Sequence, residues 1–204
     1  MLTTFLVLAS SRLAVRIKAV SAQGALLSVL YLTVRGHLFD IHTIALFFIT
    51  FIVKTVFIPI LISRTAKSVQ TKAEFEPVMS SPVTLMIGAA LIVISFTSIR
   101  FFPLVTSHVV STLTVPAALA TVLVGFLILV TKAKATNQVI GFLILENGIF
   151  TFGMTIISDF PMMVEFGVLL DLLVGVFIMG IMIYQINKTF DHIDTRTLSV
   201  LGDE

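Results

Sequence analysis

Long, nearly uninterrupted apolar blocks constrain this chain more than any other feature of its sequence. Six blocks approach or exceed the ~20 apolar residues that a helix needs to cross the hydrocarbon core of a bilayer. Their apolar residues do not follow the period of 3.6 or 2 that marks a half-buried element of a soluble protein. The sequence therefore predicts an all-α, polytopic transmembrane helix bundle with spans over Val20–Val34, Ile41–Ile62, Pro82–Ile99, Val105–Val130, Gln138–Ile157 and Met162–Tyr184.

The composition agrees with this fold class and excludes several kinds of site. Charged residues make up 12% of the chain and the mean hydropathy is +1.11, whereas soluble domains carry roughly twice that charged share. The chain has no cysteine, so it offers no thiolate to an iron–sulfur cluster or a metal ion. The four histidines lack metal-ligand spacing, and we expect no metal site. The basic residues lie in short loops, where membrane topology explains them without nucleic acid.

A seventh candidate span, Met1–Ser11, is short. It can cross the membrane only if its helix continues through Leu13 and Val15, with Arg12 and Arg16 reaching back to the interface. Because basic residues follow the apolar run and none precedes it, the segment does not resemble a cleaved signal peptide. We therefore expect about seven spans.

The loops between the spans differ in charge. Ten of the thirteen Lys and Arg residues fall in the odd-numbered loops and the tail, whereas the even-numbered loops hold only Arg35 and Arg100. Cytoplasmic loops are enriched in Lys and Arg, which predicts an N-terminus outside and a C-terminus in the cytoplasm. We expect one transmembrane helical domain over residues 1–187 and a cytoplasmic tail over residues 188–204.

Three ionisable residues, Lys54, Glu146 and Asp171, lie near the middle of predicted spans. Each costs ~2.5–3.5 kcal/mol even on a mild insertion scale, so such residues face the bundle interior, pair with one another or line an ion path. Their similar depth on different helices predicts a chain of ionisable groups along the membrane plane, completed by partner subunits and water. The alternative is a buried salt bridge that only fixes helix packing.

Small residues surround the aspartate. Gly167 and Gly175 lie one turn before and one turn after Asp171, so another helix can approach closely and supply a partner for the carboxylate. Glu165 lies near the outer end of the same predicted span, on a different face from Asp171. It is either a solvated residue at the mouth of a path or the end of a charge path.

The other two charges also have distinctive neighbours. Phe142 and Phe150 bracket Glu146 at four residues on each side, which predicts an apolar cuff that excludes water from the carboxylate. Pro59 follows Lys54 by five residues. Because proline has no amide hydrogen and its ring clashes with the carbonyl four residues earlier, it leaves a polar backbone group near the lysine.

The C-terminal third carries a distinctive series of motifs: Gly141-Phe-Leu-Ile-Leu-Glu146-Asn147-Gly148, Met163-Val-Glu165-Phe-Gly167 followed by Asp171, and Asp194-Thr-Arg-Thr-Leu198. Upstream lie Gln23, in the second predicted span, and Lys54-Thr-Val-Phe-Ile-Pro59. Together these motifs resemble the component E subunit of hydrogenase-4 and formate hydrogenlyase-type complexes.

From about residue 138, the chain is also similar to the K-type (4L) subunit of respiratory complex I and the C-type subunit of multisubunit cation/proton antiporters. Members of that group carry a glutamate in each of two adjacent helices. Asp171 matches one of these positions. The other aligns with Leu143, and the acidic residue of this chain, Glu146, follows one turn later.

The resemblance implies a non-catalytic membrane-arm subunit of a group 4 nickel–iron hydrogenase-like complex in a prokaryotic cell membrane. The nickel–iron centre and iron–sulfur clusters would belong to partner subunits, among them antiporter-like subunits and the subunit that docks the hydrogenase module. The open alternatives are a subunit of a cation/proton antiporter or complex I-like assembly, a self-sufficient secondary transporter and a structural scaffold. The residues implied in a proton or sodium relay are Lys54, Glu146, Asp171 and Glu165, supported by Gln23, Pro59, Asn147, Gly167 and Gly175.

Overall fold

Nearly all of the chain that the computed structural model describes is helical. The described residues are 1–35, 41–68, 79–98, 113–132, 134–156, 167 and 169–181, and no strand occurs among them. The last helix of the described residues, called here the last helix, covers Leu169–Ile181. The preceding elements are α1 (Leu2–Ala9), α2 (Leu13–Arg35), α3 (Ile41–Ile52), the π-helical segment η1 (Val53–Phe57), α4 (Ile58–Ser68), α5 (Ser81–Ser98), α6 (Thr114–Thr131) and α7 (Ala135–Ile156).

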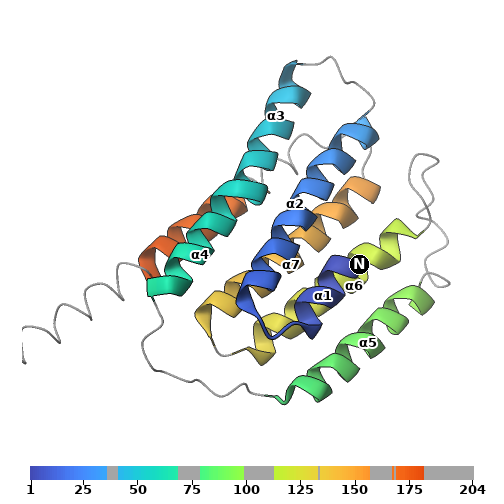
Figure 1. The fold of residues 1–204 in the computed structure, drawn as a ribbon. Coiled ribbons are helices and arrows are strands. Elements are labelled where there is room, and N and C mark those ends of the chain that lie inside the picture. The colour runs from blue at the N-terminus through green and yellow to red at the C-terminus, as the bar shows by residue number, and fades with distance from the viewer. Residues whose placement is uncertain are drawn as a thin grey trace, which may run out of the picture.

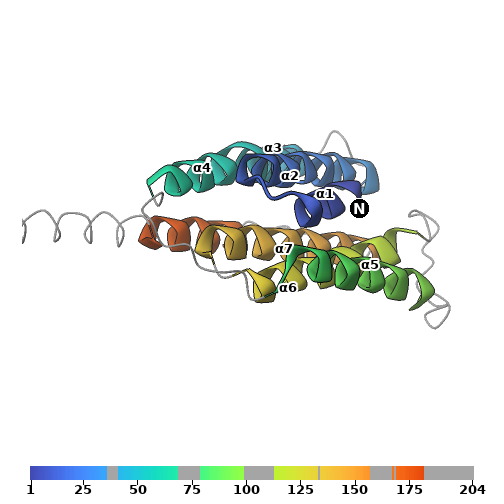
Figure 2. The same ribbon diagram turned by 60° about the horizontal axis from the view of Figure 1, so that its bottom comes forward.

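The helices form two layers, seen one in front of the other in Figure 1 and edge-on in Figure 2. One layer contains α2 and the continuous helix formed by α3, η1 and α4. The other contains α5, α6, α7 and the helix over Leu169–Ile181, and α6 and α7 pack together most extensively. Short α1 packs against α2, α5 and α6. Buried apolar side chains from α1, α2, α4, α6, α7 and the last helix form one core cluster.

Four helical stretches of the described residues are long and apolar enough to cross a membrane. They are Leu13–Leu32, Phe47–Ala66, Ser81–Ser98 and Thr114–Thr131. Large apolar side chains are exposed on the outer faces of the bundle, as at Val176, which is 65% exposed. A soluble surface rarely carries so much contiguous apolar area. These features support a membrane protein.

The sequence placed the start of the chain incorrectly. The second helix begins at Leu13, seven residues before the predicted Val20, and the first helix does not continue into it. Helix α1 ends at Ala9, and Ser10 has an extended backbone with φ −79° and ψ 132°. Eight helical residues are about 12 Å long, well short of the hydrocarbon thickness. The continuation that a span from Met1 required is therefore absent.

The other boundaries agree more closely with the predictions. Helix α5 matches its predicted span to within one residue at each end, whereas α4 continues to Ser68, six residues past the predicted end. Helix α7 begins at Ala135 and spans 22 residues, which corresponds to about 33 Å. The first part of the predicted span Val105–Val130 and the tail over residues 188–204 lie outside the described residues.

Candidate ion-handling site

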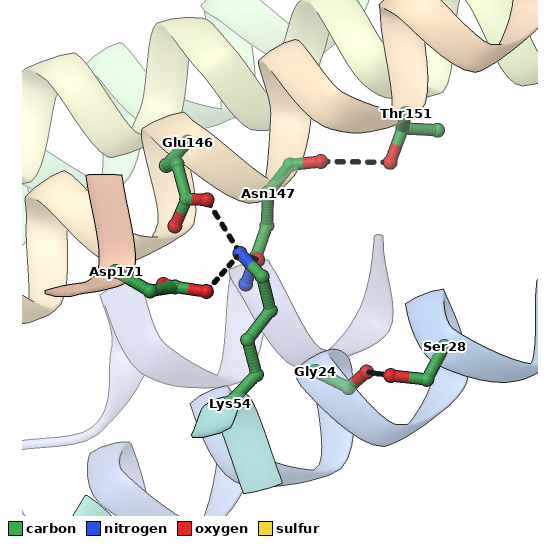
Figure 3. A network of polar contacts seen from close by, with 7 residues as sticks. All are labelled: Gly24, Ser28, Lys54, Glu146, Asn147, Thr151 and Asp171. Atoms are coloured by element: carbon green, nitrogen blue, oxygen red, sulfur yellow. Dashed lines mark hydrogen bonds and ion pairs between the residues drawn. The ribbon is translucent and has the colours of Figure 1, made fainter. Parts of the chain in front are cut away.

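Lys54 connects the two layers of the bundle. It lies in η1, where the continuous helix widens to π-helical geometry for five residues. Such π-helical segments occur frequently at functional sites because they displace a side chain from the regular helical path. Figure 3 shows the Lys54 side chain extending from η1 towards Glu146 and Asn147 of α7 and Asp171 of the last helix.

The lysine ammonium contacts groups on two helices of the opposite layer. Its Nζ donates to Glu146 Oε1 at 2.5 Å and to Asn147 Oδ1 at 3.2 Å. Asp171 Oδ2 lies 3.2 Å from the same nitrogen, an ion-pair distance, although the pair lacks hydrogen-bond geometry. Lys54, Glu146 and Asp171 are 5%, 2% and 0% exposed. The predictions that Glu146 is buried and that Asp171 has a partner across a helix interface are confirmed.

The structure brings the three charges together at one point. The lysine contacts both carboxylates directly, and the chain of ionisable groups along the membrane plane, which partner subunits and water would complete, stays a prediction. Asn147 belongs to the same cluster as a neutral acceptor. Glu165, the fourth residue predicted for the relay, lies outside the described residues.

We name this group of residues the ion cluster; it consists of Lys54, Glu146, Asn147 and Asp171. Its charges do not balance when all of its ionisable groups are charged. One ammonium faces two carboxylates, and the cluster becomes neutral when it holds one additional proton. Glu146 Oε2 and both oxygens of Asp171 are buried without a hydrogen-bond partner in the described part of the chain. An uncompensated buried charge is costly, so the arrangement favours a proton or another small cation beside the lysine.

A glycine of α2 lets the lysine backbone pack against that helix. A Cβ on Gly24 would lie 2.8 Å from Lys54 Cβ and 3.3 Å from the Lys54 carbonyl carbon. These distances are shorter than ordinary packing contacts, so a larger residue would displace η1. Sequence reasoning missed Gly24, although a glycine beside the polar Gln23 within an apolar span is itself a signal of close helix approach.

Pro59 acts on the backbone beside the lysine as the sequence predicted. Its ring position leaves the Thr55 carbonyl without an intrahelical donor. The structure supplies a replacement, because Ser21 Oγ on α2 donates to Thr55 O at 2.6 Å. This bond satisfies the freed carbonyl within the bundle, one residue away from Lys54. The role of Ser21 was not predicted, since nothing in the sequence shows which helix faces the proline break.

Of the residues predicted to surround the two carboxylates, Phe150 and Gly167 lie beside the ion cluster. The Phe150 ring is buried, and its centroid lies 5.8 Å from Lys54 Nζ. A Cβ on Gly167 would lie 3.4 Å from Phe150 Cδ2 and 3.7 Å from Glu146 Oε1. The hydrogen of Gly167 thus faces the glutamate. Gly175 instead faces side chains of η1 and α4, namely Phe57 and Leu61.

Further polar side chains are buried in the same layer as the lysine. Gln23 Oε1, Thr50 Oγ1 and Thr55 Oγ1 have no hydrogen-bond partner in the described structure. Gln23, predicted to support the site, is 8% exposed and makes no hydrogen bond to the ion cluster. Buried polar atoms of this kind are normally satisfied by protein or water. They make the lysine side of the cluster more polar than the phenylalanine side.

The described residues contain no group of three metal-ligating side chains. Two carboxylates that share one lysine can bind and release a proton or a small cation. No step of covalent catalysis follows from the residues of this site.

Comparisons with known proteins give little further information. No family model matches the chain, and no solved structure matches it. It is 31% identical over 131 residues to a protein of Mycobacterium tuberculosis (strain ATCC 25618 / H37Rv) named "Uncharacterized protein Rv0085". The aligned segment covers 64% of this chain and 59% of that relative. The likeness assigns no activity.

Proposed function

We propose that this chain is a non-catalytic, multi-pass subunit of a redox-driven ion-translocating complex of the hydrogenase-4 or formate hydrogenlyase type. The observation that carries the proposal is the ion cluster, in which one lysine and two carboxylates from three helices meet in the bundle core. Intramembrane ionisable residues mark ion or proton routes by default. The motif resemblance of the C-terminal third supports the same type of complex.

The geometry of the ion cluster favours the transfer of a proton between its carboxylates over a fixed arrangement of charges. Lys54 lies closer to Glu146 than to Asp171, and a small movement of a flexible lysine would exchange the preferred partner. Each exchange changes which carboxylate is compensated and which one holds a proton. A redox step in a neighbouring subunit can drive such an exchange if it alters the electric field at the lysine. Na⁺ in place of H⁺ would use the same carboxylate oxygens.

The proposed topology follows from the charge asymmetry of the loops. The connection between α1 and α2, the connection after α4 and the α6–α7 turn, taken together with the adjoining ends of α2 and α4, contain eight of the thirteen basic residues. We place these segments and the tail on the cytoplasmic side of a prokaryotic cell membrane. A cysteine introduced at exposed Ser80 tests this directly, because the natural chain contains no cysteine. We expect labelling from the cytoplasmic side only, and labelling only from outside would overturn the orientation.

A structural scaffold is the second candidate function. The observation that favours it is the bridge that Lys54 makes between the two layers, which could serve packing alone. Co-isolation separates both candidates from a self-sufficient transporter. We expect the tagged chain, extracted gently from its native membrane, to bring with it nickel–iron and iron–sulfur subunits. Isolation as a lone chain that transports ions after reconstitution would overturn the proposal.

Translocation measurements then distinguish relay from scaffold. The measured quantity is the number of ions moved per hydrogen turned over by the reconstituted native complex. We expect Glu146→Gln and Asp171→Asn to lower this ratio while the complex still assembles, because each change removes a titrating carboxylate and retains its shape. Arg64→Gln, which neutralises an exposed charge on α4, is the control and should leave the ratio unchanged. If both variants assemble and pump normally, the ion cluster is structural.

A further inference from the structure

A second buried cation lies at one end of the bundle, far along α2 from the ion cluster. Arg16, in the first turn of α2, is 7% exposed. Its Nε donates to Ser10 O at 2.7 Å, and its Nη1 donates to Asn137 Oδ1 at 3.0 Å. The guanidinium thereby joins the α1–α2 connection to the first turn of α7. Both acceptors are neutral, and no carboxylate of the described residues pairs with this arginine.

More basic residues gather at the same end. Lys132 directly follows α6, and Lys134 is exposed in the turn before α7, whose residue Asn137 holds Arg16. Burial, and secondarily the positive charge of Arg16, lowers the pKa of the Lys132 ammonium. Arg12 is exposed just before α2. The cations lie on two connections that are more than a hundred residues apart in sequence.

The apolar lengths of two helices place this end at the level of lipid headgroups. The apolar stretch of α2 begins at Leu13, one turn before Arg16, and that of α6 ends at Thr131, one residue before Lys132. Two spans thus reach the membrane interface beside the same group of cations. Headgroup phosphates occupy that level, and basic pockets between transmembrane helices commonly bind anionic headgroups.

The arginine has free donors with which to bind an anion. A guanidinium carries five N–H donors, and the hydrogen bonds of Arg16 to Ser10 O and Asn137 Oδ1 engage Nε and Nη1. These bonds fix the orientation of the planar group. A preoriented guanidinium binds phosphate through paired hydrogen bonds, and a lysine ammonium adds a flexible point charge. The guanidinium of Arg16 is held in one orientation, whereas the ammonium groups of Lys132 and Lys134 can adjust their positions.

We propose that Arg16, Lys132 and Lys134 bind the phosphodiester of an anionic phospholipid at the end of the bundle formed by the α1–α2 connection and the α6–α7 turn. The bound headgroup neutralises a cluster to which the described residues contribute no carboxylate. It also connects the two layers at this end, in addition to the contact between Arg16 and Asn137. This role is independent of ion movement at Lys54.

The test uses the purified full chain in nanodiscs of two compositions. One contains phosphatidylcholine alone, and the other also contains phosphatidylglycerol. We expect phosphatidylglycerol to raise the unfolding temperature, because a ligand of the folded state stabilises it. We expect the apparent affinity for phosphatidylglycerol to fall about fivefold when one of the cations is removed by Lys132→Gln or Arg16→Gln. Lys18→Gln, which removes an exposed charge from the same helix, should have no effect.

The stability of the variants in the two kinds of nanodisc either supports or overturns the lipid site. If Arg16→Gln fails to fold, Lys132→Gln still reports on the site, because the Lys132 side chain makes no ion pair within the described part of the chain. Equal stabilisation by phosphatidylglycerol in wild type and Lys132→Gln would overturn the proposal. Inorganic phosphate, added to phosphatidylcholine nanodiscs, distinguishes the source of the phosphate. If it stabilises the chain and phosphatidylglycerol does not, the site takes a soluble phosphate and the lipid assignment is wrong.

Discussion

The interface between α6 and α7 and the interface around Lys54 hold helices together by different means. Between α6 and α7, backbones touch at glycines: a Cβ on Gly125 would overlap the Leu145 amide nitrogen, and one on Gly148 would lie 2.7 Å from the Val122 amide nitrogen. No ion pair of the described residues crosses that interface. Across the layers, by contrast, a lysine contacts two carboxylates in the core.

The difference indicates what the charges are for. Small residues allow close backbone packing, which is the usual basis of helix association in membranes. A buried ion pair contributes little net stability compared with well-packed apolar residues, because desolvation offsets the attraction. Glycine packing holds α6 on α7 within one layer, whereas the three charges lie between the layers, where burying them is costly and contributes little net stability. Their presence in the core therefore supports a role in moving ions.

The largest expected effect comes from removing the shared cation. Lys54→Met leaves two buried carboxylates without compensation, and we expect a loss of about 3–5 kcal/mol of unfolding free energy. Thermal or denaturant unfolding of the full chain in nanodiscs measures this. The matched control neutralises all three charges together in Lys54→Met/Glu146→Gln/Asp171→Asn, which should recover most of the loss. A loss below about 1 kcal/mol for the single change would contradict the described pairing.

The second effect concerns the glycine interface. We expect Gly125→Ala to cost about 1–3 kcal/mol, because the added methyl group meets the backbone of Leu145 and the helices must separate. Gly180→Ala is the matched control, since a Cβ there meets nothing within 4 Å. Unfolding of both variants under the same conditions compares them. If the two changes have equal effects, close α6–α7 contact does not determine stability, and the contrast between the interfaces fails.

A smaller effect is expected at the proline break. Ser21→Ala removes the donor to the Thr55 carbonyl that Pro59 leaves unpaired, and we expect a loss of about 0.5–1.5 kcal/mol. Ser63→Ala is the control, because that hydroxyl donates to the carbonyl of Ile60 within its own helix. Unchanged stability of Ser21→Ala, relative to this control, would show that the bond across helices is dispensable.

Much of the bundle was predictable from hydropathy because a membrane span must be long, apolar and helical. The span Pro82–Ile99 matches α5 closely, and the depth of Lys54 within its helix followed from its position in an apolar block. The start of the chain was not predictable in this way. Only the short polar stretch Ser10–Arg12 separates the apolar residues of α1 from those of α2, and it lacks the glycine or proline that would mark a helix break.

It was harder to predict from the sequence that the three charges meet in one cluster. Hydropathy gives the depth of a residue but not the direction in which its side chain points around the helix. The convergence of Lys54 with Glu146 and Asp171 depends on the π-helical turn at the lysine and on the close approach of Gly24. Both are local backbone features that leave only weak signals in the sequence.

The variants that neutralise a single carboxylate should change stability least, and they are the most informative. In Asp171→Asn, Lys54 keeps its 2.5 Å contact with Glu146, and in Glu146→Gln it keeps the 3.2 Å ion pair with Asp171. One carboxylate is enough to balance one ammonium. We therefore expect each single change to alter the unfolding free energy by no more than about 1 kcal/mol.

The double variant Glu146→Gln/Asp171→Asn should behave quite differently from either single change. It leaves the lysine buried without a carboxylate, and we expect a loss of about 3–5 kcal/mol, far more than the sum of the two single effects. Such non-additivity means that each carboxylate can serve as the counter-ion when the other is neutral. That interchangeability is what a proton-exchanging pair requires. If the single effects simply add, the carboxylates act independently, and the ion cluster holds the layers together without exchanging a proton.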